Sequence, residues 1–221
     1  MTIHLLKNNI DLLLGARCEL CTGGGNILAS LNTFYTGDRN KWRKWLAENF
    51  EKEKEVWFVF PKKESGEIGL SYNEAVEEAL CFGWIDSTVK TLDASHMIQR
   101  FSPRRKGSSY SRANIERLIW LESQGMLHPK VRSSVLEIIS KPYVFPGDII
   151  ESIRNDKKAW EHYENFPASY QRIRIAYIDG ARKRPEEFKR RLESFIRKTR
   201  ENKLLGYGGI DKYYSREQVK E

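Results

Sequence analysis

The chain has 221 residues, 40% hydrophobic and 31% charged, which is the balance of a globular protein rather than a disordered, collagenous or membrane protein. Thirty-eight lysines and arginines against thirty aspartates and glutamates give a formal net charge of +8, which favours anionic partners and disfavours cationic ones. No run approaches the roughly 20 apolar residues that span a bilayer, and no secretory signal is recognised, so we expect a cytoplasmic protein without membrane insertion.

Residues 1–31 show little periodicity and form a poorly specified N-terminal extension. Cys18 and Cys21 have zinc-knuckle or redox spacing, but a structural zinc needs four ligands and no second pair lies nearby. The run Gly23–Gly25 lacks the Lys-Ser/Thr pair of a phosphate loop. The sequence therefore indicates no metal, no other cofactor and no disulfide framework.

Three elements are predicted between residues 41 and 83. Apolar side chains at helical spacing predict a helix over 41–50, and the β-branched and aromatic run 56–60, closed by Pro61, predicts a buried strand. Ser71 and Glu74 have the spacing of a capping box, and the helix that they begin is expected to end at Gly83.

After Gly83 the apolar period changes to two, which predicts a β-hairpin with strands over 84–92 and 96–102. One face of the hairpin carries Asp86 and Lys90. In the register that keeps the two faces aligned, Asp86 lies opposite Arg100 or Ser102.

Helices are predicted from Ser111 and from about Pro129. The stretch 141–147 contains two prolines and a glycine, and downstream of it every apolar pattern is helical. We therefore expect an α+β domain over 32–141, with a small antiparallel sheet and packed helices. An all-helical C-terminal module over 142–205 and a flexible tail over 206–221 follow it.

Two basic segments are the most unusual features of the sequence. The segment 99–112 carries five cationic side chains and no acidic one, and the segment 182–203 carries ten against four glutamates. Arginines bind phosphate and carboxylate groups through their planar forks, and interleaved aromatics can stack on bases. The alternative is that both segments are solvated surfaces, with Arg100 paired to Asp86.

No catalytic centre is recognisable. The four histidines are scattered without metal-ligand spacing, no Gly-x-Ser-x-Gly elbow is present, and no histidine is placed by local spacing to activate Ser108 or Ser109. These features favour a binding protein over an enzyme, and no catalytic residues are predicted.

Two segments resemble the bacteriocin-protection family, also called the YdeI/OmpD-associated family. They are 80–87 (LCFGWIDS) and 99–105 (QRFSPRR), and the likeness extends over about 32–203, including SYNEA at 71–75 and ARKRPE at 181–186. Tyr110 stands where we expect tryptophan in this family, and Glu187 with Phe188 replaces a Thr-Arg pair. Residues 1–31 fall outside the resemblance.

The resemblance implies a cytosolic bacterial protein with an α/β N-terminal part and a helical C-terminal module. It also implies an association with resistance to bacteriocins or antimicrobial peptides, and it carries no catalytic residues with it. Direct capture of a cationic peptide fits poorly with a protein of charge +8.

Two functional hypotheses follow. The first is a non-enzymatic stress-resistance protein whose basic surface, formed by both basic segments, binds an anionic ligand, nucleic acid or an acidic protein partner. The alternative is a small-molecule enzyme or sensor with a pocket around Trp84, Asp86 and Arg100, where Asp86 serves as base and Arg100 as anion clamp. Neither the ligand nor the oligomeric state is predicted. The expected binding residues are Trp84, Asp86, Lys90, Arg100, Ser102, Arg104, Arg105, Arg182, Arg184 and Arg190.

Overall fold

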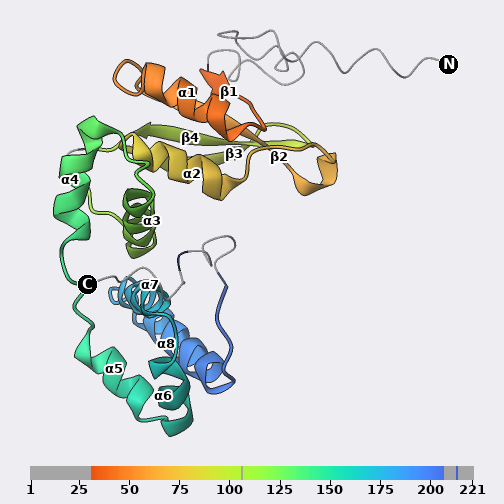
Figure 1. The fold of residues 1–221 in the computed structure, drawn as a ribbon. Coiled ribbons are helices and arrows are strands. Elements are labelled where there is room, and N and C mark those ends of the chain that lie inside the picture. The colour runs from red at the N-terminus through yellow and green to blue at the C-terminus, as the bar shows by residue number, and fades with distance from the viewer. Residues whose placement is uncertain (1–30, 106, 207–212, 214–221) are drawn as a thin grey trace. The chain divides into compact units, whose positions relative to one another are not determined.

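A computed structural model describes residues 31–105, 107–206 and 213 of the chain (Figure 1). These residues divide into two units by their contacts: unit 1 lies within 1–79 and 84–104, and unit 2 within 80–83 and 105–221. The predicted extension and tail lie outside the described residues, apart from 31, 206 and 213. The predicted α+β class is confirmed, because a small sheet belongs to the N-terminal part and helices make up the C-terminal part.

The sheet of unit 1 has four strands in the order β1-β2-β4-β3. Strand β4 (His96–Pro103) pairs antiparallel with both β2 (Val56–Pro61) and β3 (Trp84–Thr91), and these three match the predicted strands. Strand β1 (Thr33–Phe34) pairs with β2 in parallel and was not predicted. The sheet is therefore mixed rather than wholly antiparallel.

Two helices of unit 1 pack on the sheet. Helix α1 (Arg39–Asn49) is capped by Asp38, whose side chain accepts from the backbone N–H of Asn40 at 2.8 Å. Helix α2 (Tyr72–Cys81) begins with the predicted capping box: Ser71 N donates to Glu74 Oε2 at 3.1 Å, and Glu74 N donates to Ser71 Oγ at 3.3 Å. A 3₁₀ turn, η3 (Lys63–Ser65), lies between β2 and α2.

Trp42 is the centre of the core of unit 1. It is fully buried, and its ring lies 5.0 Å from that of Phe58 in β2 and 5.7 Å from that of Phe101 in β4. Its indole N–H donates to the carbonyl of Ala75 in α2 at 3.1 Å. One side chain of α1 therefore joins α2 to one face of the sheet.

The hairpin register differs from the prediction. Ile85 lies opposite Ser102 and Asp86 opposite Phe101, and the pairing is irregular between Asp86 and Val89, which lies opposite Gln99. The predicted position of Asp86 opposite Arg100 or Ser102 is wrong, because an irregularity of this kind shifts the register of one strand against the other.

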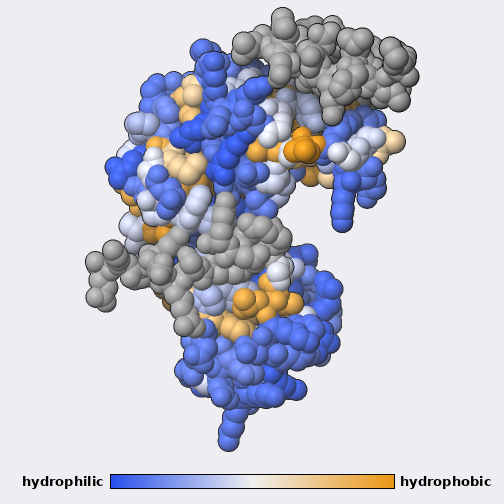
Figure 2. Space-filling model, turned by 45° about the vertical axis from the view of Figure 1, so that its right-hand side comes forward, coloured by the Kyte–Doolittle hydropathy of each residue, from blue (hydrophilic) through white to orange (hydrophobic). Residues whose placement is uncertain are grey.

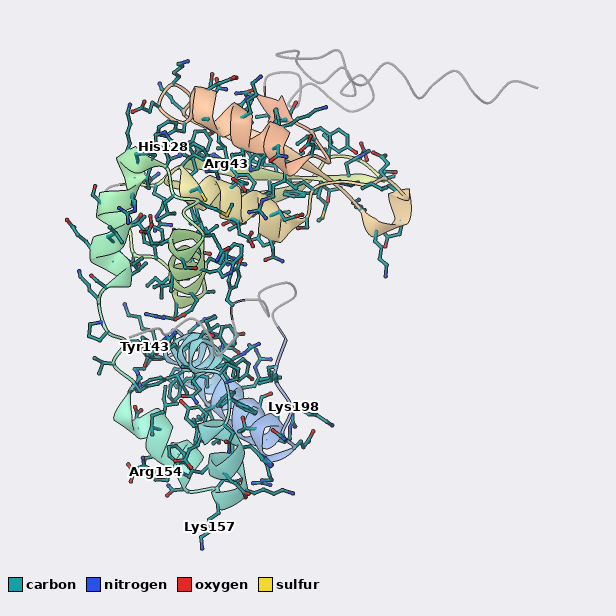
Figure 3. All side chains as sticks on the ribbon, in the orientation of Figure 1. Arg43, His128, Tyr143, Arg154, Lys157 and Lys198 are labelled. Atoms are coloured by element: carbon teal, nitrogen blue, oxygen red, sulfur yellow. The ribbon has the colours of Figure 1, made fainter. Side chains whose placement is uncertain are left out.

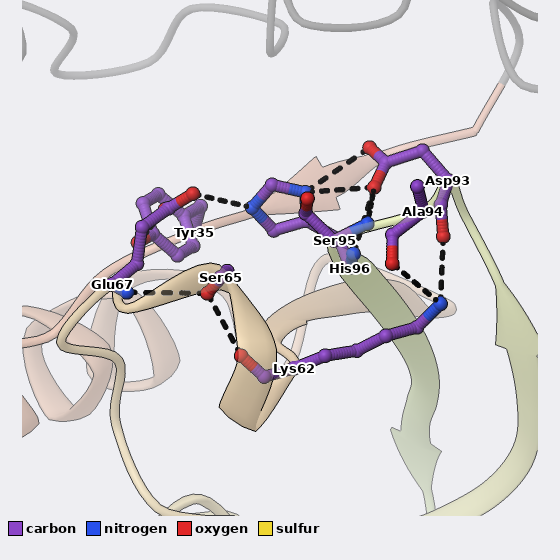
Figure 4. A network of polar contacts seen from close by, with 8 residues as sticks. All are labelled: Tyr35, Lys62, Ser65, Glu67, Asp93, Ala94, Ser95 and His96. Carbon is purple, nitrogen blue, oxygen red and sulfur yellow. Dashed lines mark hydrogen bonds and ion pairs between the residues drawn. The ribbon is translucent and has the colours of Figure 1, made fainter.

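A polar network closes the turn end of the hairpin (Figure 4). Asp93 Oδ1 accepts from the backbone N–H groups of Ser95 and His96, each at 2.7 Å. The imidazole of His96 lies between Asp93 and Glu67, at 3.0 and 3.2 Å. Burial and the hydrogen bond to Glu67 raise the pKa of Tyr35 to about 12. The network fixes the hairpin turn to the loop that precedes α2.

Unit 2 is built from six helices within its described part. They are α3 (Arg112–Ser123), α4 (Pro129–Ile139), α5 (Gly147–Arg154), α6 (Lys157–Glu164), α7 (Ala168–Asp179) and α8 (Pro185–Arg200). The core of α5–α8 is formed by buried aliphatic and aromatic side chains, among them Ile153, Tyr170 and Phe195. Ala113 and Trp120 of α3 pack against the same core, so α3 groups with the C-terminal helices. The boundary predicted at 141–142 stays a prediction.

Gly83 follows α2 in a left-handed backbone conformation, which a substitution can test. Its φ is +72°, and a Cβ added there would meet Val131 at an ordinary contact distance of 3.5 Å, so the cost of a side chain is conformational rather than steric. We expect Gly83→Ala to lower the free energy of unfolding by about 1–2 kcal/mol, measured by urea denaturation. Gly147→Ala is the control, because a Cβ at the start of α5 meets nothing within 4 Å. Equal stability of the two variants would contradict the assigned conformation.

Candidate anion-binding pocket

The predicted hairpin residues do not converge on one pocket. Trp84 is fully buried, and its indole N–H donates to the carbonyl of Phe50 at 3.1 Å. Arg100 pairs with Glu55 at 2.6 Å rather than with Asp86. Asp86 instead accepts hydrogen bonds from Gln99 and from the hydroxyl of Tyr72, each at 2.8 Å.

Asp86 and Arg100 lie on opposite faces of the sheet. Asp86 bonds to the side chain of Gln99, and the next residue of β4, Arg100, points to the other face because side chains alternate along a strand. Arg100 hydrogen-bonds Glu55 there, and this bond lowers the pKa of the Glu55 carboxyl. A single pocket cannot use Asp86 as base and Arg100 as clamp, as the alternative hypothesis required.

The other predicted residues of the hairpin and of the first basic segment are exposed or half-buried. Lys90 is exposed, and its ammonium lies 4.7 Å from the ring centroid of Trp57. Ser102 and Arg104 are half-buried at the end of unit 1, and Arg105 is exposed where unit 2 resumes.

The second basic segment carries local carboxylate partners. Arg182 contacts Asp148 at 2.8 Å and Asp179 at 2.7 Å, and Glu187 accepts from Arg190. The hydrogen bond from Arg182 lowers the pKa of the Asp148 carboxyl. Exposed pairs of this kind contribute little to stability, but they neutralise the surface.

The predicted basic surface of the segment 182–203 is therefore weaker than the sequence suggested. Arg184 is exposed as the N-cap of α8 and has no carboxylate partner in the described part of unit 2. The face shown in Figure 2 is largely hydrophilic, as the content of charged residues requires. The two basic segments lie in different units, so their union into one surface stays a prediction.

A buried charge cluster in unit 2 does converge on a cavity. Glu116 of α3 is 3% exposed, and its Oε1 accepts from Arg112 Nε at 2.7 Å, one turn earlier on the same helix. Arg172 of α7 binds the same carboxylate with two bonds, from Nε at 2.6 Å and from Nη2 at 2.8 Å. The hydrogen bonds to Glu116 raise the pKa of Arg172. Two guanidinium groups thus share one carboxylate, leaving one positive charge in excess.

The cluster lines a cavity of about 540 Å³. Its walls come from α3, from the end of α4 and the linker after it, from the α6–α7 junction and from α7. Tyr143, labelled in Figure 3, lies in the linker, and the Arg112 guanidinium carbon lies 5.1 Å from its ring centroid. The lining residues are Arg112, Glu116, Ile119, Ile139, Ser140, Lys141, Pro142, Tyr143, Glu164, Asn165, Phe166, Pro167, Ala168, Ser169, Arg172 and Tyr213.

The N-terminus of α7 adds to the positive potential of this cavity. Its N-cap, Pro167, provides no side-chain hydrogen bond to the first turn of the helix. Pro167 and Ala168 line the cavity together with the arginines. A helix N-terminus carries a partial positive charge and is suited to anions.

The charges at this cavity favour a small anion. Lys141 and Glu164 are exposed lining residues of opposite sign, so the excess charge of the arginine cluster is not cancelled. The side chains of Arg112 and Arg172 are 10% and 24% exposed, which leaves their positive charge weakly hydrated. In the part of the chain that the structure describes, no group of three His, Cys, Asp or Glu side chains could hold a metal ion.

Comparison with known families separates the chain into two matched segments. Residues 142–202 match the family described as Bacteriocin-protection, YdeI or OmpD-Associated. The predicted resemblance to this bacteriocin-protection family is thereby confirmed over the helical module. Residues 34–134 match a different model, described as Domain of unknown function (DUF8412). No curated protein and no solved structure gives a match.

The cavity draws residues from both matched segments. Arg112 and Glu116 lie within 34–134, whereas Tyr143 and Arg172 lie within the bacteriocin-protection segment. Sequence reasoning included Arg112 in the basic segment but assigned roles to neither Glu116 nor Arg172. The i, i+4 spacing of Arg112 and Glu116 is a local signal of their pairing, whereas Arg172 is 56 residues from Glu116. No helix among the described residues is long and apolar enough to cross a membrane.

Proposed function

We propose that this chain is a resistance protein of the bacteriocin-protection type that acts by binding an anionic ligand rather than by catalysis. The family match over 142–202 supports the resistance role. The observation that carries the binding role is the Arg112–Glu116–Arg172 cluster, in which two guanidinium groups share one buried carboxylate beside a cavity.

The cavity suits a small ligand with a phosphate or carboxylate group. Its volume of about 540 Å³ lies within the range of small-molecule pockets, roughly 300–1,000 Å³. The guanidinium N–H groups that do not bind Glu116 can donate to either group, and the N-terminus of α7 favours an anion beside them. The protein's net charge of +8 would also attract such a ligand at long range.

Replacing Arg172 tests this site. We expect Arg172→Gln to weaken binding of inorganic phosphate to the full chain at least about tenfold, because charge-assisted hydrogen bonds of this strength are worth roughly 1.5–3 kcal/mol. Glu116 keeps Arg112 as its partner in this variant, so we expect the fold to be retained. Isothermal titration calorimetry at low salt measures the affinity, and acetate serves as the carboxylate probe.

Arg190→Gln is the matched control. It removes an exposed guanidinium from the same unit and leaves the cavity intact. Heparin and single-stranded DNA form the polyanion arm, at two salt concentrations, because binding through phosphates weakens steeply as salt rises. If Arg190→Gln abolished phosphate binding and Arg172→Gln did not, the phosphate site would lie on the surface of α8, and the proposed site in the cavity would be wrong.

A further inference from the structure

A second cavity lies wholly within unit 1. It is an open groove of about 610 Å³ on the face of the sheet, at the N-terminal end of α2. Phe60 and Leu70 contribute buried apolar surface to it. Tyr72, Val89 and Met97 are 44%, 53% and 40% exposed, although all three line the groove. Apolar side chains are thus displayed together in a concave part of the surface.

One buried polar side chain lies among these apolar ones. Gln99 is 7% exposed and lines the groove. Its Nε2 donates to Asp86 Oδ2 at 2.8 Å, which fixes the carboxamide, because the carboxylate can only accept from the amide nitrogen. The Tyr72 hydroxyl donates to the same oxygen of Asp86 at 2.8 Å. The amide oxygen of Gln99 therefore points away from Asp86.

This amide oxygen has no hydrogen-bond partner among the described residues. A carbonyl oxygen at the floor of an apolar groove is well hydrated only while the groove is open to water. A ligand that fills the groove must either donate a hydrogen bond to this oxygen or leave it unpaired.

We propose that the groove binds a neutral, largely apolar molecule that carries one hydrogen-bond donor, and that Gln99 Oε1 accepts from this donor. The binding is independent of the cavity of unit 2 and of the function proposed for it. The apolar part of the ligand lies against Phe60, Leu70 and Val89, and Gln99 selects the position of its N–H or O–H group.

The rim of the groove favours a neutral ligand over a charged one. Lys62 is held by the carbonyls of Asp93 and Ala94, at 2.8 and 3.1 Å (Figure 4). Lys63 and Glu67 are exposed rim residues of opposite sign. Lys62 and Lys63 are thus matched by two carboxylates, those of Glu67 and of Asp86 beside Gln99, so the groove has no excess charge of one sign and an ionic end gives a ligand little advantage.

Two probes with the same apolar chain distinguish a ligand with a hydrogen-bond donor from one without. Hexanamide and methyl hexanoate share an apolar chain, but only the amide carries N–H groups. We expect hexanamide to shift the methyl resonances of Val89 and Met97 in the full chain, with an affinity about tenfold higher than that of the ester. Equal affinities would refute the role of Gln99. Hexanoate binding more tightly than hexanamide would assign the groove to an anion and refute the neutral ligand.

Two variants test the place of binding. Val89→Lys puts a long charged side chain into the groove from an exposed position of β3, and it should abolish the hexanamide shifts at Met97. Ala47→Lys adds the same charge at an exposed position of α1, away from the groove, and should leave the affinity unchanged. Equal loss in both variants, or loss in neither, would overturn the proposal.

Replacing Gln99 tests the hydrogen bond itself. Gln99→Leu replaces the carboxamide with an apolar side chain, and circular dichroism checks that the variant folds. The ratio of the hexanamide and methyl hexanoate affinities should fall from about ten to about one. An unchanged ratio in a folded variant would show that another acceptor binds the amide.

Discussion

Glu116→Gln should destabilise the protein by about 3–5 kcal/mol, because it leaves two guanidinium groups together without the carboxylate that neutralises them. Glu116 is 3% exposed and accepts from Arg112 and Arg172 at 2.5–2.8 Å. Glutamine keeps the size of the side chain but can accept through only one oxygen and carries no charge. Urea denaturation, with far-ultraviolet circular dichroism as the readout, measures the loss.

Two comparisons separate this charge effect from a packing effect. The double variant Glu116→Gln, Arg172→Gln should regain part of the lost stability, because one of the two repelling cations is gone. Glu201→Gln removes an exposed partner of two lysines and should change stability little. A Glu116→Gln variant as stable as the native chain would show that water, and not Glu116, compensates the arginines.

Phosphate should protect Glu116→Gln more than it protects the native chain. A ligand that binds the folded state raises its stability by an amount that grows with the logarithm of its affinity, and an anion at this cavity takes over part of the role of the missing carboxylate. The same variant thereby links the stability of the cluster to the proposed function. A phosphate effect equal in both proteins would place the phosphate away from Glu116.

The helices and strands that the sequence predicted correctly are those marked by a signal within a few neighbouring residues. The capping box of Ser71 and Glu74 begins α2, and the change of period after Gly83 marks the start of β3. The two-residue strand β1 is too short to show a period, and its parallel pairing with β2 depends on residues more than twenty positions away. The irregular pairing after Asp86 has no clear local signature either, and it moved Asp86 away from its predicted neighbours.

The candidate site was harder to predict than the fold, because its charges pair across long separations. One interpretation of the sequence paired Arg100 with Asp86 within the hairpin, but the partner of Arg100 is Glu55, 45 residues away and just before β2. Counting charges within 182–203 overstated the basic surface, because Asp148 and Asp179 lie outside that segment and bind Arg182. A linear charge count records none of these partners.

Trp42→Ala should be the most damaging substitution in unit 1, with a loss of about 3–5 kcal/mol. Trp42 is fully buried, and its ring contacts those of Phe34, Phe58 and Phe101 at centroid distances of 5.4, 5.0 and 5.7 Å. Alanine leaves a cavity where α1, α2 and the sheet meet. Denaturation followed by near-ultraviolet circular dichroism, which reports on the packed aromatic rings, measures the effect.

Two further variants, Trp42→Phe and Trp45→Ala, separate the contribution of the buried ring of Trp42 from those of its hydrogen bond and of the neighbouring ring. Phenylalanine keeps an aromatic ring in the core but removes the indole N–H that donates to Ala75, so we expect a smaller loss of about 1–2 kcal/mol. Trp45 stacks on Trp42 at 5.3 Å but is half-buried, so its removal should cost less than that of Trp42. If Trp45→Ala proved as damaging as Trp42→Ala, the stability of unit 1 would depend on the surface of α1 rather than on the junction that Trp42 fills.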